Sequence, residues 1–185
     1  MSKIIVCPLA RVEETVREHR PGRILTLLNP RDCSVYGSDW DAVDAYAETL
    51  SAEGLSPDEH LQVGVYDITL PTEGQTVPDE THVRQVLDFA RRWDGEQPVL
   101  VHCFAGISRS TASAFILACE KNPHVEEREI ARRIRERSPT AFPNPLIVSI
   151  ADEMMGRRGR MADAVGAMGL SRPGPAEPFH IEARW

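Results

Sequence analysis

The residues most suited to chemistry lie in one short segment, between a cysteine and an arginine six positions later. Cys103 follows the apolar run 99–101, and Arg109 precedes a longer apolar stretch. If a buried strand ends at Cys103 and a helix begins near Arg109, the backbone N–H groups between them can turn inward and form a cradle for an anion. Gly106 lies in this turn and permits a backbone conformation that other residues resist.

Such a cradle performs two chemical tasks. Inward N–H groups and the positive end of a helix dipole favour the thiolate of Cys103, the nucleophilic form of cysteine. The same groups bind a phosphate dianion above the sulfur, and Arg109 can hold two phosphate oxygens in a fork. Phosphoryl transfer depends mainly on positioning and charge stabilisation, which this arrangement supplies. The sequence therefore predicts a phosphocysteine intermediate that water then hydrolyses.

The neighbours of the two key residues have predicted roles as well. The hydroxyl of Ser110 can donate to the sulfur and stabilise the thiolate as leaving group in the second step. His102 is expected to be buried and to hold the loop backbone by hydrogen bonds rather than to transfer protons. No metal or other cofactor is expected, because the thiolate is the nucleophile and the cradle carries the charge. The predicted phosphate-binding residues are Phe104, Ala105, Gly106, Ile107, Ser108 and Arg109.

This segment resembles the protein tyrosine and dual-specificity phosphatase superfamily, whose signature is H-C-x-x-G-x-x-R-[ST]. A Pro-Asn pair before an apolar helix ends the compact dual-specificity domain, and Pro143 and Asn144 precede the apolar run 146–148 in the same way. The resemblance covers residues 61–151, and the first 60 residues match only in the order of strands and helices. The start of the chain is similar to small bacterial members of the superfamily. The fixed signature positions are filled by His102, Cys103, Gly106, Arg109 and Ser110.

The resemblance also implies a general acid, an aspartate on a mobile loop that precedes the cysteine in the chain and protonates the leaving oxygen. Asp67 lies 36 positions before Cys103 and is followed by a predicted loop, so it is the first choice. Asp79, 24 positions before Cys103, is the alternative, and Glu73 lies on the loop itself. The other interpretation of Asp67 is that it merely caps a turn.

The elements that must position these residues alternate along the chain. Short apolar runs predict strands at 4–7, 24–28, 61–68 and 98–102. Helical spacing and end signals predict helices at 10–19, 39–52, 78–93, 111–119, 125–137 and 146–155, the last with room to continue to 168. This order implies one α/β domain whose central, largely parallel, twisted sheet is flanked by helices. We expect a catalytic domain over 1–170 and a loose Pro/Gly-rich tail over 171–185.

Length, charge and cysteine spacing exclude several classes of protein. A chain of 185 residues fits one domain, and its net charge of -7 argues against nucleic-acid and membrane partners. The four cysteines form no C-x-x-C pair, so a zinc ribbon is excluded. The chain has neither a signal-peptide pattern nor an apolar run long enough to span a membrane, which predicts a cytoplasmic protein. The sequence leaves the oligomeric state open.

The composition of the loop bears on the substrate. Phe104, Ala105, Ile107 and Ser108 carry no positive charge, whereas phosphatases of multiply phosphorylated inositides often place lysine there. We therefore expect a phosphorylated protein or a small phosphomonoester as substrate. The short chain lacks the recognisable phosphotyrosine loop of large tyrosine phosphatases, which favours the compact type and leaves tyrosine-only and dual specificity open.

Two other functions are compatible with a cysteine in an anion-binding loop. The chain could be a phosphate-binding module that keeps the cradle without turnover, or a rhodanese-like sulfurtransferase. The histidine before the cysteine and the Arg-Ser pair after the loop fit a sulfurtransferase poorly. Some members of the superfamily protect the nucleophile with a nearby cysteine, and Cys33 could form such a reversible disulfide with Cys103.

Overall fold

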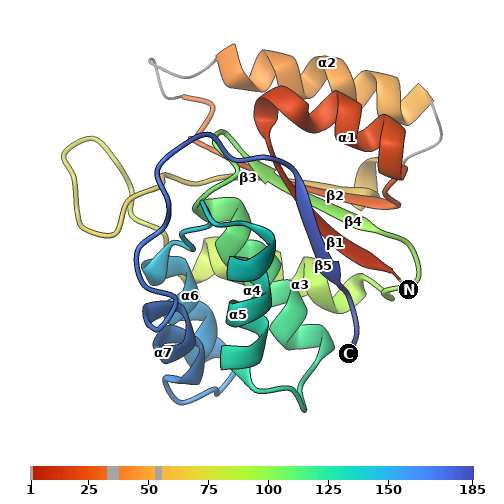
Figure 1. Cartoon of the computed structure of the whole chain (residues 1–185). Helices are drawn as coiled ribbons and strands as arrows, with labels where there is room; N and C mark the ends of the chain where they lie inside the picture. The colour runs from red at the N-terminus through yellow and green to blue at the C-terminus, as the bar shows by residue number, and fades with distance from the viewer. Residues whose placement is uncertain (1, 33–37, 53–55) are drawn as a thin grey trace.

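The computed structural model describes residues 2–32, 38–52 and 56–185, which form a five-stranded sheet between two groups of helices (Figure 1). The strand order is β3-β2-β4-β1-β5. β4 lies between β1 and β2 and is parallel to both, β3 is parallel to β2, and β5 runs antiparallel to β1. The strands are β1 (Lys3–Pro8), β2 (Arg23–Leu28), β3 (His60–Gly64), β4 (Val99–Cys103) and β5 (Phe179–Glu182).

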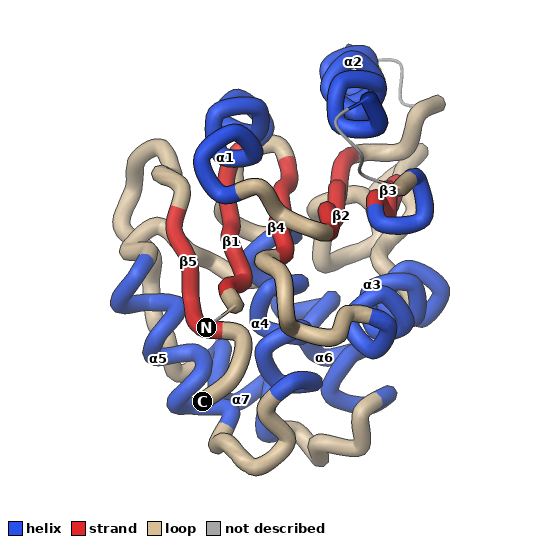
Figure 2. Tube along the Cα trace, turned by 90° about the vertical axis from the view of Figure 1, so that its right-hand side faces the viewer, coloured by secondary structure: helices blue, strands red, loops and turns tan. Residues whose placement is uncertain are grey.

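Helices cover both faces of the sheet, as Figure 2 shows. α1 (Val12–His19) and α2 (Ser38–Ala52) cover one face. The other face is covered by α3 (Glu80–Arg92), α4 (Arg109–Lys121), α5 (Glu127–Arg137), α6 (Pro145–Met154) and α7 (Arg160–Gly166). This arrangement confirms the predicted α/β domain with a largely parallel central sheet.

The apolar runs that predicted strands are apolar throughout because both faces of the sheet are buried. In β1, Ile4 and Val6 pack toward α3–α7, whereas Ile5 and Cys7 pack toward α1 and α2. α4 is buried on all sides and lies against β1, β4 and three other helices. A helix with this environment has no polar face, which explains its nearly continuous apolar sequence. The strand that ends in Cys103 and the helix that begins at Arg109 are therefore both firmly packed.

Two elements end earlier than the sequence predicts. β3 stops at Gly64 rather than at residue 68, because its partner strand β2 ends at Leu28, which pairs with Gly64. Beyond this point the carbonyl of Val65 accepts a hydrogen bond from the Arg109 side chain at 2.8 Å. α6 does not continue to residue 168. The chain turns through Gly156 and Gly159, which have φ of 65° and 87°, and then forms the separate helix α7.

The C-terminal segment differs from the expected loose tail over 171–185. Residues 179–182 form β5, which pairs with β1 along its free edge. Phe179 and Ile181 are buried against the core, with exposed fractions of 8% and 3%. Pairing with a strand at the other end of the chain stabilises this segment, and no local pattern predicts such a contact. Within the described ranges, no helix is both long and apolar enough to cross a bilayer.

Candidate active site

The loop between β4 and α4 is pressed against the end of β1. The backbone N–H of Leu9 donates to the carbonyl of Phe104 at 3.1 Å. Gly106 has φ of 72°, and a Cβ atom at this position would lie 2.7 Å from the backbone nitrogen of Pro8. Both the positive φ and the close approach require glycine here. The glycine at this position of the loop therefore has a steric reason in this chain.

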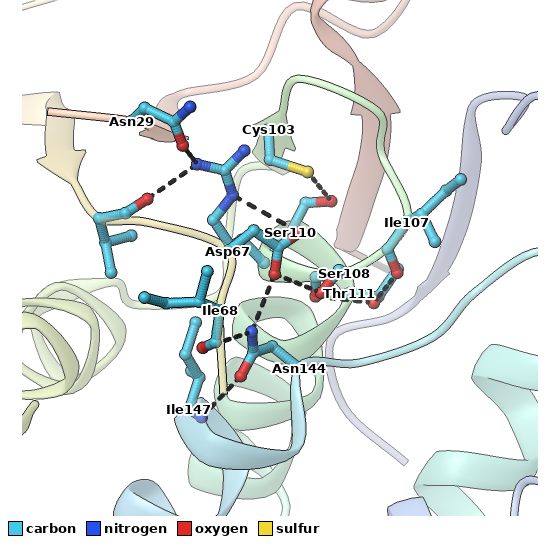
Figure 3. A network of polar contacts seen from close by, with 12 residues as sticks. Asn29, Asp67, Ile68, Cys103, Ile107, Ser108, Ser110, Thr111, Asn144 and Ile147 are labelled. Atoms are coloured by element: carbon cyan, nitrogen blue, oxygen red, sulfur yellow. Dashed lines mark hydrogen bonds and ion pairs between the residues drawn. The ribbon is translucent and has the colours of Figure 1, made fainter. Parts of the chain in front are cut away.

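Cys103 ends β4 with its thiol next to the first turn of α4 (Figure 3). Its side chain is almost completely buried, and Sγ lies 3.1 Å from Oγ of Ser110. Because α4 begins at Arg109, the unpaired N–H groups of its first turn lie beside the loop. The sulfur thus lies at the positive end of a buried helix, with a hydroxyl close enough to donate to it.

The environments of two other cysteines are different. Burial raises the pKa of the Cys7 thiol to about 12, and burial also raises the pKa of Cys119 well above its usual range. Both thiols are therefore protonated at neutral pH and poor nucleophiles. Cys33, considered as a redox partner of Cys103, lies outside the described residues.

The guanidinium of Arg109 is held in place by groups at the ends of two strands. Its Nη1 donates to Oδ1 of Asn29 at 3.0 Å and to the carbonyl of Val65 at 2.8 Å. Arg109 is 5% exposed, and its Nε has no hydrogen-bond partner among the described residues. A buried guanidinium N–H without a partner is costly, so this donor is suited to an anion in the loop.

The carboxyl group of Asp67 lies at the mouth of the loop. Oδ2 lies 3.9 Å from Nε of Arg109, and Oδ1 accepts hydrogen bonds from Oγ of Ser108 at 2.6 Å and Nδ2 of Asn144 at 2.8 Å. The fold thus brings Asp67, which lies 36 positions before Cys103 in the chain, next to the loop between β4 and α4.

The alternative acids lie in other surroundings. Asp79 caps α3, where its carboxylate accepts hydrogen bonds from the N–H groups of Thr81 and His82 at 2.9 and 3.2 Å. Glu73 is exposed on the loop after Asp67. The carboxyl group of Asp39, which no motif in the sequence singles out, interacts electrostatically with Arg109. Burial raises the pKa of Asp39, and the positive charge of Arg109 opposes this effect.

His102 belongs to a buried polar network on the α2 side of the sheet. Its Nε2 lies 2.7 Å from Oγ1 of Thr26 and 2.6 Å from the hydroxyl of Tyr46, and Nε2 of His60 lies 2.8 Å from the same Thr26 oxygen. Burial, with the nearby His60 as a smaller cause, lowers the pKa of His102 to about 3. Burial also lowers the pKa of His60 to about 4. His102 is therefore neutral at physiological pH and anchors β4 to β2 and α2.

These two imidazoles predict a loss of stability in weak acid. Because folding lowers both pKa values from the ordinary 6.5, the unfolded chain binds more protons than the folded protein between pH 6.5 and pH 4. The free energy of unfolding should fall as the pH decreases through this window, by up to about 2 kcal/mol per histidine at pH 5. Thermal unfolding at pH 7 and pH 5 measures the effect. H60Q should reduce the difference between the two pH values, and an unchanged difference would contradict the assignment.

An open groove of about 500 Å³ lies beside the loop on the Asp67 side. Leu70 and Phe142 line it and are 73% and 47% exposed, and Phe104 in the loop itself is 54% exposed. No lysine or arginine is among the described residues that line the groove. The described residues that line it are Asp67, Ile68, Thr69, Leu70, Thr72, Ser108, Phe142, Asn144 and Pro145.

Comparisons with known proteins agree with this geometry. A sequence model described as protein-tyrosine phosphatase matches residues 44–146. The crystal structure of Cydia Pomonella PTP-2 phosphatase has a TM-score of 0.51 and 14% identity, with 80% of this chain and 83% of that chain covered. PTPMT1 has a TM-score of 0.51 and 18% identity, with 83% and 91% covered. At such identities these structures show a shared fold alone.

No curated protein matches the chain. The family model, however, covers more than half of it and includes β4, the loop and α4. The matched segment thus contains the cysteine, the arginine and the carboxyl group that the fold brings together. The chain belongs to the protein-tyrosine phosphatase family.

Proposed function

We propose that this protein hydrolyses phosphate monoesters through a phosphocysteine intermediate, with Cys103 as nucleophile, and that phosphotyrosyl proteins are its main substrates. One observation carries the proposal. The thiol of Cys103 lies at the N-terminus of α4, 3.1 Å from Oγ of Ser110, while the guanidinium of Arg109 is fixed with an unpartnered Nε. This is a preformed site for a dianion above a nucleophile.

In the first step, the phosphate group of the substrate lies in the loop between Cys103 and Arg109. The thiolate attacks phosphorus, so that the S–P bond forms while the bond to the leaving oxygen breaks. Asp67, in its protonated form, gives its proton to that oxygen, and the alcohol or phenol departs. The inward N–H groups and Arg109 stabilise the charge on the equatorial oxygens.

In the second step, water attacks the phosphocysteine. The carboxylate of Asp67 takes a proton from the water, the S–P bond breaks, and inorganic phosphate forms. The departing sulfur becomes a thiolate again. The hydroxyl of Ser110 is close enough to donate a hydrogen bond to it, which lowers the cost of its departure.

The surroundings of the site support a singly phosphorylated substrate with an apolar group next to the phosphate. The groove beside Asp67 exposes Leu70 and Phe142, and Phe104 adds a third apolar side chain. Because none of the described residues that line it is basic, the groove offers no partner for a second phosphate there. An aromatic phosphoester in a protein fits this description better than a polyphosphorylated inositide does. Activity on phosphoserine and phosphothreonine would make the enzyme dual-specific.

Hydrolysis of para-nitrophenyl phosphate under reducing conditions, with a chelator present, tests the proposal. We expect turnover that vanadate inhibits, and a subsequent panel should favour phosphotyrosyl peptides over phosphoinositides. Binding of phosphate without turnover would support a phosphate-binding module instead. Transfer of sulfur from thiosulfate to cyanide, without phosphatase activity, would support a sulfurtransferase.

Removal of the general acid has a large expected effect. D67N should lower kcat/KM for phenyl phosphate by about 10²–10⁴-fold, because the phenolate must then leave without a proton. D79N is the matched control and should stay within about twofold of wild type, since asparagine also caps a helix. If D79N or D39N produces the loss and D67N does not, the assignment of Asp67 is wrong.

A further inference from the structure

We infer that Ser108 and Asn144 are positioning residues that fix the orientation of the Asp67 carboxyl group, so that its Oδ2 and not its Oδ1 exchanges the catalytic proton. The inference rests on the proposed function and adds to it. Neither residue needs to touch the reacting atoms for this role. Both act through the two hydrogen bonds that Oδ1 of Asp67 accepts.

The first argument is the occupancy of Oδ1. The hydroxyl of Ser108 donates to it at 2.6 Å and the amide of Asn144 at 2.8 Å (Figure 3). A protonated carboxyl has one O–H donor, and an oxygen that already accepts two hydrogen bonds is a poor site for that proton. The proton is therefore carried by Oδ2.

The second argument is the direction of Oδ2. This oxygen lies 3.9 Å from Nε of Arg109, the buried donor that has no hydrogen-bond partner among the described residues. A phosphate held by Arg109 must approach this Nε. The leaving oxygen attached to such a phosphate then comes next to Oδ2, which is where the proton is needed.

The third argument is that the side-chain amide of Asn144 cannot rotate so as to exchange its oxygen and nitrogen. Its Oδ1 accepts hydrogen bonds from the N–H groups of Leu146 and Ile147 at 3.1 Å each and thereby caps α6. These two donors require an oxygen at that position, so the nitrogen must face Asp67. Asn144 is 2% exposed, and its backbone N–H reaches the carbonyl of Ser108 at 3.4 Å.

Ser108, the other donor to Oδ1 of Asp67, is held in place as well. The carbonyl of Ser108 accepts from the N–H of Ala112 at 2.9 Å and from Oγ1 of Thr111 at 3.0 Å, so its backbone is tied to the first turn of α4. The side chain of Ser108 caps no N–H group of that helix. Its hydroxyl thus serves Asp67 without a competing structural task.

Such fixation matters because Asp67 itself is weakly held. Its side chain is 34% exposed, and it lies beyond the end of β3, at the start of the exposed stretch 69–76. Rotation about the bond to a carboxyl group is broad and nearly two-fold, so without the two donors either oxygen could face the substrate. Preorganisation of the acid reduces the barrier to proton transfer.

The test compares two substrates that differ in their need for an acid. Phenyl phosphate has a poor leaving group that must be protonated, whereas 2,4-dinitrophenyl phosphate has a good one that leaves as the anion. S108A removes one donor. N144S removes the other but keeps a side-chain oxygen that can cap α6. Each variant should lower kcat/KM for phenyl phosphate by about tenfold more than it lowers kcat/KM for 2,4-dinitrophenyl phosphate.

A double-mutant cycle gives the decisive measurement. In a D67N background, S108A and N144S should have no further effect on phenyl phosphate, because there is no longer an acid to orient. S108T keeps the hydroxyl and should restore most of the activity lost in S108A. S113A is the matched control for loss of a hydroxyl, since Oγ of Ser113 is buried in α4 and has no hydrogen-bond partner among the described residues.

Several outcomes would overturn the inference. Equal losses on both substrates would show that the two residues only support the structure of the loop. If S108A and N144S lower kcat/KM for phenyl phosphate as much in the D67N background as in the wild type, they act independently of Asp67. If N144S does not fold, S108A and S108T decide the question by themselves. A wild-type protein without turnover would refute the proposed function, whereas an active wild type with unaffected variants refutes this inference alone.

Discussion

C103S should lower kcat for para-nitrophenyl phosphate by about 10⁴-fold or more while phosphate binding is retained. Serine fits the buried position at the end of β4, so the loop and Arg109 keep their places. Its hydroxyl is not ionised at neutral pH and is therefore a far weaker nucleophile than a thiolate. The variant thus keeps the anion site and loses the nucleophile.

Two measurements separate these effects. Turnover is followed by release of nitrophenolate, and binding of inorganic phosphate by calorimetry. C119A serves as the control, because Cys119 is buried in α4 and its thiol is protonated at neutral pH. Turnover by C103S at a rate near that of wild type would exclude the phosphocysteine mechanism. Loss of both turnover and phosphate binding would instead indicate that the loop had collapsed.

R109K should lower kcat/KM by about 10³-fold or more even though the positive charge is kept. Lysine presents all its donors from one nitrogen, so it cannot hold two phosphate oxygens in a planar fork as a guanidinium does. It also leaves Oδ1 of Asn29 and the carbonyl of Val65 without the donor that now reaches both. Arg109 therefore contributes to the position of two strand ends as well as to phosphate binding.

The control for R109K is R84K, an exposed arginine on α3 whose ion pair with Glu80 lysine can retain. R84K should leave kcat/KM unchanged. The thermal unfolding midpoint of R109K should also fall, because buried acceptors lose their partner. An R109K variant within tenfold of wild type would refute the assignment of Arg109 as the phosphate fork.

The core of the site could be predicted because it is contiguous in sequence. His102, Cys103, Gly106 and Arg109 lie within one strand, one turn and the start of one helix. Their spacing therefore reports their geometry directly. Asp67 could be proposed only through the resemblance, and its contact with Ser108 became visible only in the folded chain.

The supporting residues could not be found in the same way. Asn29 follows β2, and no motif in the sequence marks its side chain as a partner of Arg109. Asn144 had been noted as part of a family pattern, and its hydrogen bond to Asp67 spans 77 positions. The partners of His102, Thr26 and Tyr46, come from β2 and α2. Such contacts depend on packing between distant elements, which no local pattern encodes.

The position of β1 in the sheet has a consequence for how the protein folds. Ile4 pairs with Val99 on one side and Ile181 on the other, and Pro8 forms the wall against which Gly106 packs. During synthesis the first strand therefore emerges long before either neighbour exists. High contact order slows folding and prolongs exposure of unpaired strand edges. The catalytic loop should be among the last parts to form on the ribosome. Until then, the apolar first strand is the segment that most needs protection from aggregation through its unpaired edges.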